Sequence, residues 1–319
     1  MDVLQYVKTK GSFSTLLMGV GSVCAGTAAA AIRGNLEILP ATVCLLFAAF
    51  TQLGANYWHA YNNYTKYIQA VPMSRIERLE AEKNPLKQRV LREAAVGCLI
   101  FSLMLGLTLM SMYAVPWFAL ILGALVYGLY GVITYKGREF LGTLAGLLVT
   151  FILFGPVGVF GTCLIQTQHE ATASMWGSYD TTPPIPATIL MGLLAINVHL
   201  IHSYYANVMT EGKIKYNVSR TLGKKMTIFL VILNGFLSFI FMGIKVFTYD
   251  FPQPLIADVP FFLGLALNTY IGLRMYNSSG SELSHLVLLS KANMFLTGFV
   301  MLIVWWAVGV PDDSMRTFF

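Results

Sequence analysis

Two hydrophobic stretches of the chain end in clusters of polar side chains that could hold a ligand. The first cluster consists of Asn56, His59, Asn62 and Asn63, and the second of His199, His202, Asn207 and Thr210. Imidazole groups can serve as acids, bases or transition-metal ligands. Neither cluster contains an aspartate, and residues 3–179 contain none at all. The hard cation Mg²⁺ prefers carboxylate and water oxygens, so these clusters favour neutral hydrogen bonding over Mg²⁺ binding.

The three histidines allow more than one interpretation. His199 and His202 are three residues apart, which places them on one face of a helix. If His59 approached them, three imidazoles could bind Zn²⁺ or another transition metal. The alternatives are hydrogen bonds to neighbouring helices, a pair acting as acid and base, or a grip on a quinone oxygen. We expect no cofactor, and Mg²⁺ only if this interpretation of the site is wrong.

The composition predicts a polytopic membrane protein with almost no room for a soluble domain. Of 319 residues, 56% are hydrophobic and 11% are charged, whereas a soluble domain has roughly 25% charged residues. The mean hydropathy is +0.65. A membrane-spanning helix needs roughly 20 apolar residues. The candidate spans cover residues 12–32, 36–57, 93–113, 115–135, 141–165, 186–205, 226–247, 255–273 and 292–310.

The short polar lead from Met1 to Gly11 has no clear cleavage site after it, so we expect the first span to be retained. The four cysteines are isolated from one another within predicted spans and suggest no disulfide or C-x-x-C pair. The net charge of +6 does not indicate nucleic acid, because cytoplasmic loops of membrane proteins accumulate Lys and Arg. With the N-terminus inside, every Lys and Arg falls in an inside segment except Arg33, Lys245 and Arg316. This asymmetry predicts nine spans with the N-terminus in the cytoplasm and the C-terminus outside.

The two longest inside connections, 58–92 and 206–225, follow spans two and six, and we interpret them as cytoplasmic cap loops of a single transmembrane domain, 1–319. Their spacing suggests a quasi-repeat, in which each half presents a polar helix end and a basic loop to the same side. The first loop is either a solvated surface helix near anionic headgroups or a lid whose basic residues meet a lipid diphosphate.

Several strings in the chain resemble the UbiA-type membrane prenyltransferases, and most closely the 1,4-dihydroxy-2-naphthoate prenyltransferases. Gln52, Gly54 and Asn56 match the start of the first family signature, Q-x-G-x-N. The string from Phe154 to Thr162, F-G-P-V-G-V-F-G-T, with Gln166 after it, is the most specific match. Lys215 and the pair Leu222-Gly223 match the second signature. The resemblance covers about residues 5–310 and implies an all-α fold of nine transmembrane helices around a central cavity.

The chain departs from the family where the family binds Mg²⁺-diphosphate. In the first signature, His59 replaces an asparagine, and three other residues replace aspartates: Ala60, Asn63 and Tyr67. In the second signature, Tyr205 replaces an arginine, and Ala206 and Thr210 replace aspartates. Alanine cannot ligate a metal, and ionisation of an allylic diphosphate leaves charge that the metal must neutralise. We therefore expect a degenerate active site that has lost the family's Mg²⁺-dependent prenyl transfer.

The resemblance then implies a protein of a bacterial cytoplasmic membrane that binds an isoprenoid diphosphate or a quinone-like lipid. The expected ligand-binding residues are Asn56, His59, Asn63, Lys66, His199, His202, Tyr205 and Lys215. One alternative is an active enzyme with a non-standard site, either a prenyltransferase of a menaquinone-type pathway or a terpene cyclase. Another is a non-catalytic scaffold subunit that docks a membrane-protein partner.

Overall fold

The computed structural model describes residues 13–32, 36–70, 85–113, 117–136, 142–167, 184–209, 217–248, 254–278 and 281–308. Almost all of these residues are helical and none of them lies in a strand, which confirms the all-α prediction for the described part of the chain. Seven helical segments within it are long and apolar enough to cross a membrane. The protein is therefore an integral membrane protein by length and composition.

The helical elements follow one another along the chain. A 3-10 turn, η1 (Phe13–Thr15), leads into the first helix, and a π-helix, η2, joins two short helices in the middle of the chain. In order along the chain, the elements after η1 are α2 (Leu16–Ala31), α3 (Ile38–Ala70), α5 (Pro85–Tyr113), α6 (Trp117–Lys136), α8 (Leu144–Ile152), η2 (Leu153–Phe160), α9 (Gly161–Gln166), α11 (Pro184–Met209), α12 (Val218–Thr248), α13 (Pro254–Ala257), α14 (Val259–Asn277) and α15 (Ser281–Val308).

Each apolar range expected from the sequence coincides with a helix or with a run of consecutive helices. The number of membrane crossings stays a prediction, because two expected spans are not among the seven segments: α2, which has only 16 residues, and α6. Helices extend into both of the ranges that were expected to be cap loops. Helix α3 continues to Ala70 and α5 begins at Pro85, so only 71–84 of the range 58–92 lies outside the described residues. Similarly, α11 ends at Met209 and α12 begins at Val218.

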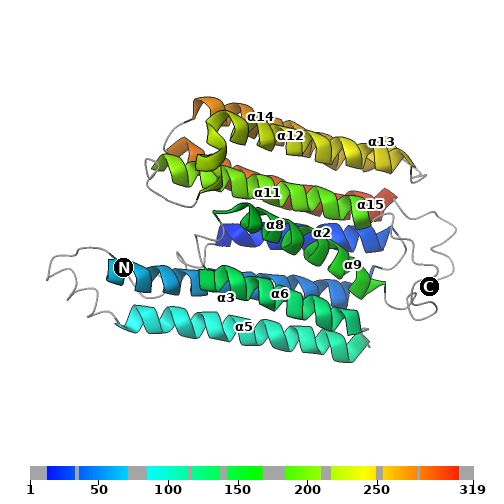
Figure 1. Ribbon diagram of the computed structural model, residues 1–319. Helices are drawn as coiled ribbons and strands as arrows, with labels where there is room; N and C mark the ends of the chain where they lie inside the picture. Colours follow the sequence, from blue (N-terminus) through cyan, green and yellow to red (C-terminus); the bar gives the residue numbers. More distant parts are fainter. Residues whose placement is uncertain are drawn as a thin grey trace.

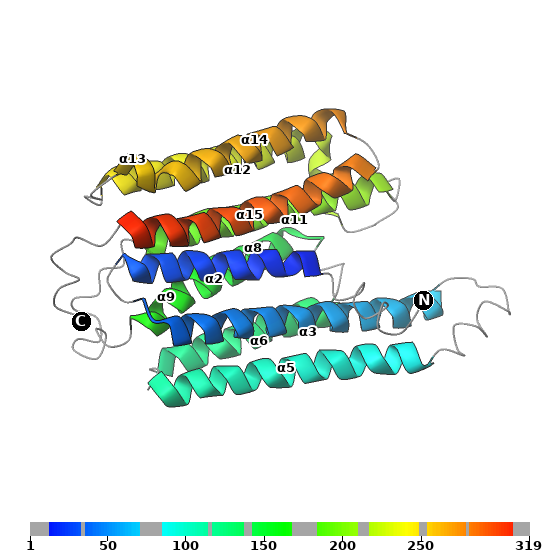
Figure 2. The same cartoon turned by 180° about the vertical axis from the view of Figure 1, so that it is seen from behind.

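The helices run roughly parallel or antiparallel to one another in two layers. Figure 2 shows one layer in front, in the order α14, α15, α2, α3 and α5 from top to bottom. Figure 1 shows the other layer in front, with α12, α11, the α8–α9 run and α6. Both views place α2 between α3 on one side and α11 with α15 on the other. Helix α2 therefore separates the two halves of the molecule.

Helices α2 and α15 cross at two glycines that allow their backbones to touch. A Cβ atom on Gly21 would lie 2.8 Å from the carbonyl oxygen of Met294, and one on Gly298 would overlap the carbonyl oxygen of Gly21. Small residues at such crossings are typical of membrane helices, where close van der Waals packing replaces the hydrophobic drive. The N-terminal half is thus joined to α15, the last helix that the structure describes.

The π-helix η2 contains Pro156, which lacks a backbone N–H and cannot continue a regular α-helical ladder. Two glycines of the same segment face different neighbours. A Cβ on Gly155 would lie 2.7 Å from the carbonyl oxygen of Thr188 on α11, and one on Gly158 would lie 2.8 Å from Cβ of Ser22 on α2. The F-G-P-V-G string therefore fits η2 tightly between α11 and α2.

Three asparagines fill the space between α11, α12 and α14 in the C-terminal half. The Asn197 side-chain amide donates to the carbonyl oxygen of Val231 (3.1 Å) and to Oδ1 of Asn268 (3.1 Å). Asn234 donates to Oδ1 of Asn197 (3.2 Å), and Asn268 donates to the carbonyl oxygen of Val231 (3.0 Å). Such hydrogen bonds hold helices together where lipid offers no partner, so a buried network of asparagines joins α11, α12 and α14 in this half.

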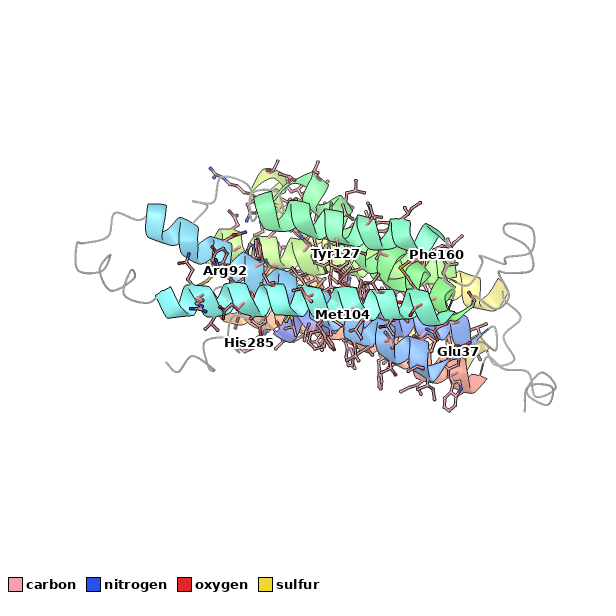
Figure 3. All side chains as sticks on the ribbon, turned by 90° about the horizontal axis from the view of Figure 1, so that it is seen from below. Glu37, Arg92, Met104, Tyr127, Phe160 and His285 are labelled. Carbon is pink, nitrogen blue, oxygen red and sulfur yellow. The ribbon has the colours of Figure 1, made fainter. Side chains whose placement is uncertain are left out.

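One end of the helix bundle carries the basic residues. We call it the basic end, where α3, α11 and α14 finish and α5, α12 and α15 begin. The described basic side chains near it are Arg89, Arg92, Arg220, Lys224, Lys225, Arg274 and Lys291. Figure 3 shows Arg92 and His285 toward this end and Glu37 toward the opposite end, with Tyr127 between them.

Candidate functional site

A cavity of about 400 Å³ lies in the N-terminal half, between α2, α3, α5, α6 and the run from η2 to α9. Its volume is in the range of small-molecule sites in proteins, roughly 300–1,000 Å³. Most of its wall is aliphatic or aromatic, and none of the described lining residues is charged. The cavity therefore suits a neutral, largely apolar molecule.

A few hydroxyl and amide groups interrupt this apolar wall. The Tyr130 hydroxyl donates to Oε1 of Gln52 over a long 3.5 Å. The Tyr127 hydroxyl and Oγ of Ser102 are hydrogen-bonded at 2.8 Å, and the Tyr127 ring meets Phe47 edge-on, with ring centroids 6.3 Å apart. Phenol and amide groups of this kind can orient a ligand oxygen within an otherwise apolar pocket.

The cavity reaches the outer surface between α5 and α6. These helices are consecutive in the chain, but α5 packs mainly along α3, whereas α6 meets α3 and η2. The hydrogen bond from Ser102 to Tyr127 links the two. Leu103 and Leu107 of α5 both line the cavity and are about half exposed, at 48% and 54%. A lipid chain could therefore enter sideways from the bilayer.

The first predicted polar cluster lies on α3, and its members with described side chains, Asn56, His59 and Asn62, are not part of the cavity wall. The Asn56 side-chain amide donates to Oγ1 of Thr15 (2.7 Å), which ties α3 to the turn before α2. His59 is half-buried on the same helix. Ala60 packs with Tyr57 against Leu91 of α5, as part of a small apolar cluster. Three further predicted residues lie on α3, but their side chains are outside the described ones: Asn63, Lys66 and Tyr67.

The second predicted cluster lies on α11, in the other layer. Nδ1 of His199 and Oγ1 of Thr150 on α8 are 3.3 Å apart and share a hydrogen bond. His202 is exposed, with its ring centroid 6.5 Å from that of Tyr205. Ala206 is half-buried. Thr210 and Lys215 lie outside the described residues.

The structure does not bring these two clusters into one central cavity. Helix α2 lies between α3 and α11 (Figures 1 and 2), and the cavity lies to one side of α2, where α11 does not line it. His59, His199 and His202 do not form a metal-binding group, and no group of three or more His, Cys, Asp or Glu with such geometry occurs among the described residues. The described residues therefore give no support to a three-histidine metal site, which stays a hypothesis.

Mg²⁺ also does not fit the described residues at the family positions. Ala60 and Ala206 have no ligand atoms, and the described walls of the cavity contain no carboxylate. A hard divalent cation needs several oxygen ligands, preferably carboxylates. No step of the proposed function therefore passes through this metal.

The residues that carry the resemblance line the cavity more than the polar clusters do. Gln52 from the first string and five residues of the η2 string contribute to its wall, namely Phe154, Val157, Gly158, Gly161 and Thr162. Tyr127 and Tyr130 also line it. From the sequence, the strings around Gln52 and from Phe154 to Thr162 were identified as family matches, but none of these cavity-lining residues was predicted to bind a ligand. Their signal was the combination of glycines and aromatic residues within spans.

Neither a family model nor a curated protein matches the sequence. The relation to UbiA-type prenyltransferases therefore depends on the strings quoted above and stays an expectation. What is shown is a polytopic, all-helical membrane protein with a neutral cavity among its N-terminal helices.

Proposed function

We propose that this protein binds an isoprenoid or quinone-type lipid, with the apolar part of the lipid in the cavity between α2, α3, α5, α6 and η2. The observation that carries the proposal is the uncharged, largely apolar wall of a cavity of about 400 Å³. Its side opening between α5 and α6 offers a route from the bilayer. Branched isoprene units fit such a wall through van der Waals contacts, since a tail that arrives from the bilayer leaves no polar surroundings behind.

The polar groups of the wall favour a ligand that carries an oxygen. The Tyr130 hydroxyl has only a long hydrogen bond to Gln52, at 3.5 Å. A quinone carbonyl could accept from Tyr130, and a hydroquinone hydroxyl could donate to Oε1 of Gln52. This pairing would replace one weak bond by two bonds of normal length.

The proposal includes loss of the family's Mg²⁺-dependent prenyl transfer. It is supported by Ala60 and Ala206, which stand where carboxylates would have to hold the metal. An active prenyltransferase or cyclase with a non-standard site, and a scaffold subunit for a membrane-protein partner, are the alternatives that the test must exclude.

We further propose that the basic end faces the cytoplasm of a bacterial cell, with the N-terminus inside and the C-terminus outside. The support is the collection of described Lys and Arg side chains at that end, as the positive-inside rule expects. In a variant free of native cysteines, Arg92→Cys should react with a membrane-impermeant maleimide only after permeabilisation. Labelling of Arg92→Cys in intact cells would reverse the orientation.

Filling the cavity tests the proposal directly. Gly123 of α6 lines the cavity, and a Cβ placed on it meets no atom within 4 Å. Gly128 lies on the same helix, is exposed, also has open space at Cβ, and does not line the cavity. We expect Gly123→Leu to weaken binding of an isoprenoid quinone about tenfold or more, because its side chain takes the ligand's space. Gly128→Leu should bind as the parent does, since both changes raise helix propensity alike.

The measurement is a titration of the purified full chain in lipid nanodiscs with an isoprenoid quinone, with chelator present throughout. Equal affinity in the parent and both variants would contradict the cavity as the binding site. Product formed from an isoprenyl diphosphate and a naphthoate acceptor would show that an active enzyme is the correct alternative. A stoichiometric membrane protein that copurifies, together with no lipid binding, would favour the scaffold.

A further inference from the structure

Lys291 of α15 is a buried cation without a countercharge in the described part of the chain. Its side chain is 8% exposed, and its Nζ atom donates to Oγ of Ser14 at 3.1 Å. An ammonium group has three N–H donors, so this bond uses one of them. The only ion pair among the described residues is the exposed contact of Arg89 with Glu93. A cation buried in a membrane protein is costly and usually has a functional partner.

The ammonium group lies at the N-terminal end of a helix. Ser14 belongs to the 3-10 turn that leads into α2, and Thr15 occupies the N-cap position. The Thr15 side chain makes no capping hydrogen bond to the first turn of α2, and its Oγ1 accepts from the Asn56 amide. The N-terminus of a helix carries a partial positive charge and free N–H groups, which favour anions. The lysine and the helix end therefore place two sources of positive potential side by side.

The same turn lies next to the apolar cavity. Thr15 is four residues before Gly19 on α2, and Asn56 is four residues after Gln52 on α3, where Gly19 and Gln52 both line the cavity. Four residues of helix span about 6 Å. The Thr15–Asn56 contact thus lies about one turn beyond the end of the cavity along both helices.

We propose that Lys291 and the N-terminal turn of α2 bind the phosphate or diphosphate group of a lipid whose tail occupies the cavity. The lysine itself supplies positive charge for the anionic group, so this binding needs no metal. Asn56, Ser14 and Thr15 hold the turn in place between α3 and α15. The tail depends on the proposed function, but the anion site can be tested alone with a probe that has no tail.

The test uses the purified full chain in nanodiscs of neutral lipid, with chelator present. Two probes are titrated, inorganic diphosphate and an isoprenyl diphosphate. We expect Lys291→Met to lower the affinity for both probes about tenfold or more, because a charge-assisted hydrogen bond is lost. Lys225→Met removes the same charge from an exposed position at the same end and should change the affinity less than about twofold. Lys291→Arg should keep most of the affinity.

Two results would overturn the inference. One is an unchanged affinity of Lys291→Met for both probes, with its melting temperature equal to that of the parent. The other is a lowered melting temperature with unchanged affinity, which would make Lys291 only a clamp on Ser14. If the isoprenyl diphosphate binds more tightly than inorganic diphosphate, and Gly123→Leu abolishes this difference, the ligand is a lipid and not free diphosphate. Equal affinity for the two probes in the parent protein would overturn the lipid assignment. A quinone has no phosphate group, so we expect its affinity to be the same in Lys291→Met and the parent. Failure of the quinone titration would therefore contradict the proposed function without deciding the anion site.

Discussion

Asp258 has surroundings that are unusual for an acidic residue. It lies between α13 and α14, is 1% exposed, and both of its carboxylate oxygens are without a hydrogen-bond donor among the described residues. Its neighbour Ala257 accepts a hydrogen bond from Nε1 of Trp305 (3.4 Å), and Phe261 stacks edge-on against that indole. Asp258 thus lies beside an aromatic contact between α13, α14 and α15. An unpaired polar group in such a place reduces stability.

We expect Asp258→Asn to leave the protein equally stable or to raise the free energy of unfolding by up to about 2 kcal/mol, because the amide has the same shape and no charge to bury. The measurement is thermal unfolding of the purified chain in detergent. A clear loss of stability would mean that the carboxylate has a basic partner outside the described residues. Lipid binding should not change, since Asp258 does not line the cavity.

Helix α2 determines how the two halves of the molecule meet. It packs on α15 through Gly21 and Gly298, on η2 through Gly158, and on α3 through the Thr15–Asn56 hydrogen bond. With 16 residues it is short, but it is almost completely buried, so its stability comes from its neighbours. A change that widens the α2–α15 crossing should therefore affect the whole bundle.

We expect Gly298→Ala to destabilise the protein by about 1–3 kcal/mol, because the added methyl would overlap the backbone of Gly21. Gly97 of α5 is the matched control, since a Cβ there meets nothing within 4 Å. Gly97→Ala should be neutral or slightly stabilising, as alanine favours a helix over glycine. Thermal unfolding of the two variants side by side decides the matter, and equal melting temperatures would refute the close crossing.

The helices could be predicted from the sequence because hydropathy alone marks apolar stretches. Their ends could not, since hydropathy reports the membrane-embedded part and a polar helix can continue beyond it. Helix α3 shows this, because it extends through Asn62 and Asn63 to Ala70, where a loop from residue 58 was expected.

The position of the cavity could not be predicted, for a related reason. In a membrane helix, the faces toward lipid and toward protein are both apolar, so periodicity does not tell which helices share a cavity. The polar clusters were the only conspicuous signal, but Asn56 and His199 make hydrogen bonds to neighbouring helices instead. Lys291 was counted among the basic residues of the inside segments. The sequence does not show that its side chain is buried and contacts Ser14, because the two residues are far apart in the chain.

The whole molecule combines a polar, tightly packed C-terminal half with an N-terminal half that contains a cavity. The asparagines hydrogen-bond α11, α12 and α14 to one another. In the other half, α5 and α6 both line the cavity and are linked by the hydrogen bond between Ser102 and Tyr127. This asymmetry differs from the expected ring of helices around one central cavity. It places the proposed lipid site beside α2, about one helical turn from the Thr15–Asn56 contact.

The most direct test of this account is photo-crosslinking of the full chain in nanodiscs with an isoprenoid quinone that carries a diazirine on its tail, with chelator present. The account predicts adducts on cavity residues such as Leu103, Tyr127 and Val157, which are reduced in Gly123→Leu and retained in Gly128→Leu. Adducts confined to the polar ends of α3 and α11, near His59 and His202, or labelling that appears only when Mg²⁺ is added, would contradict it.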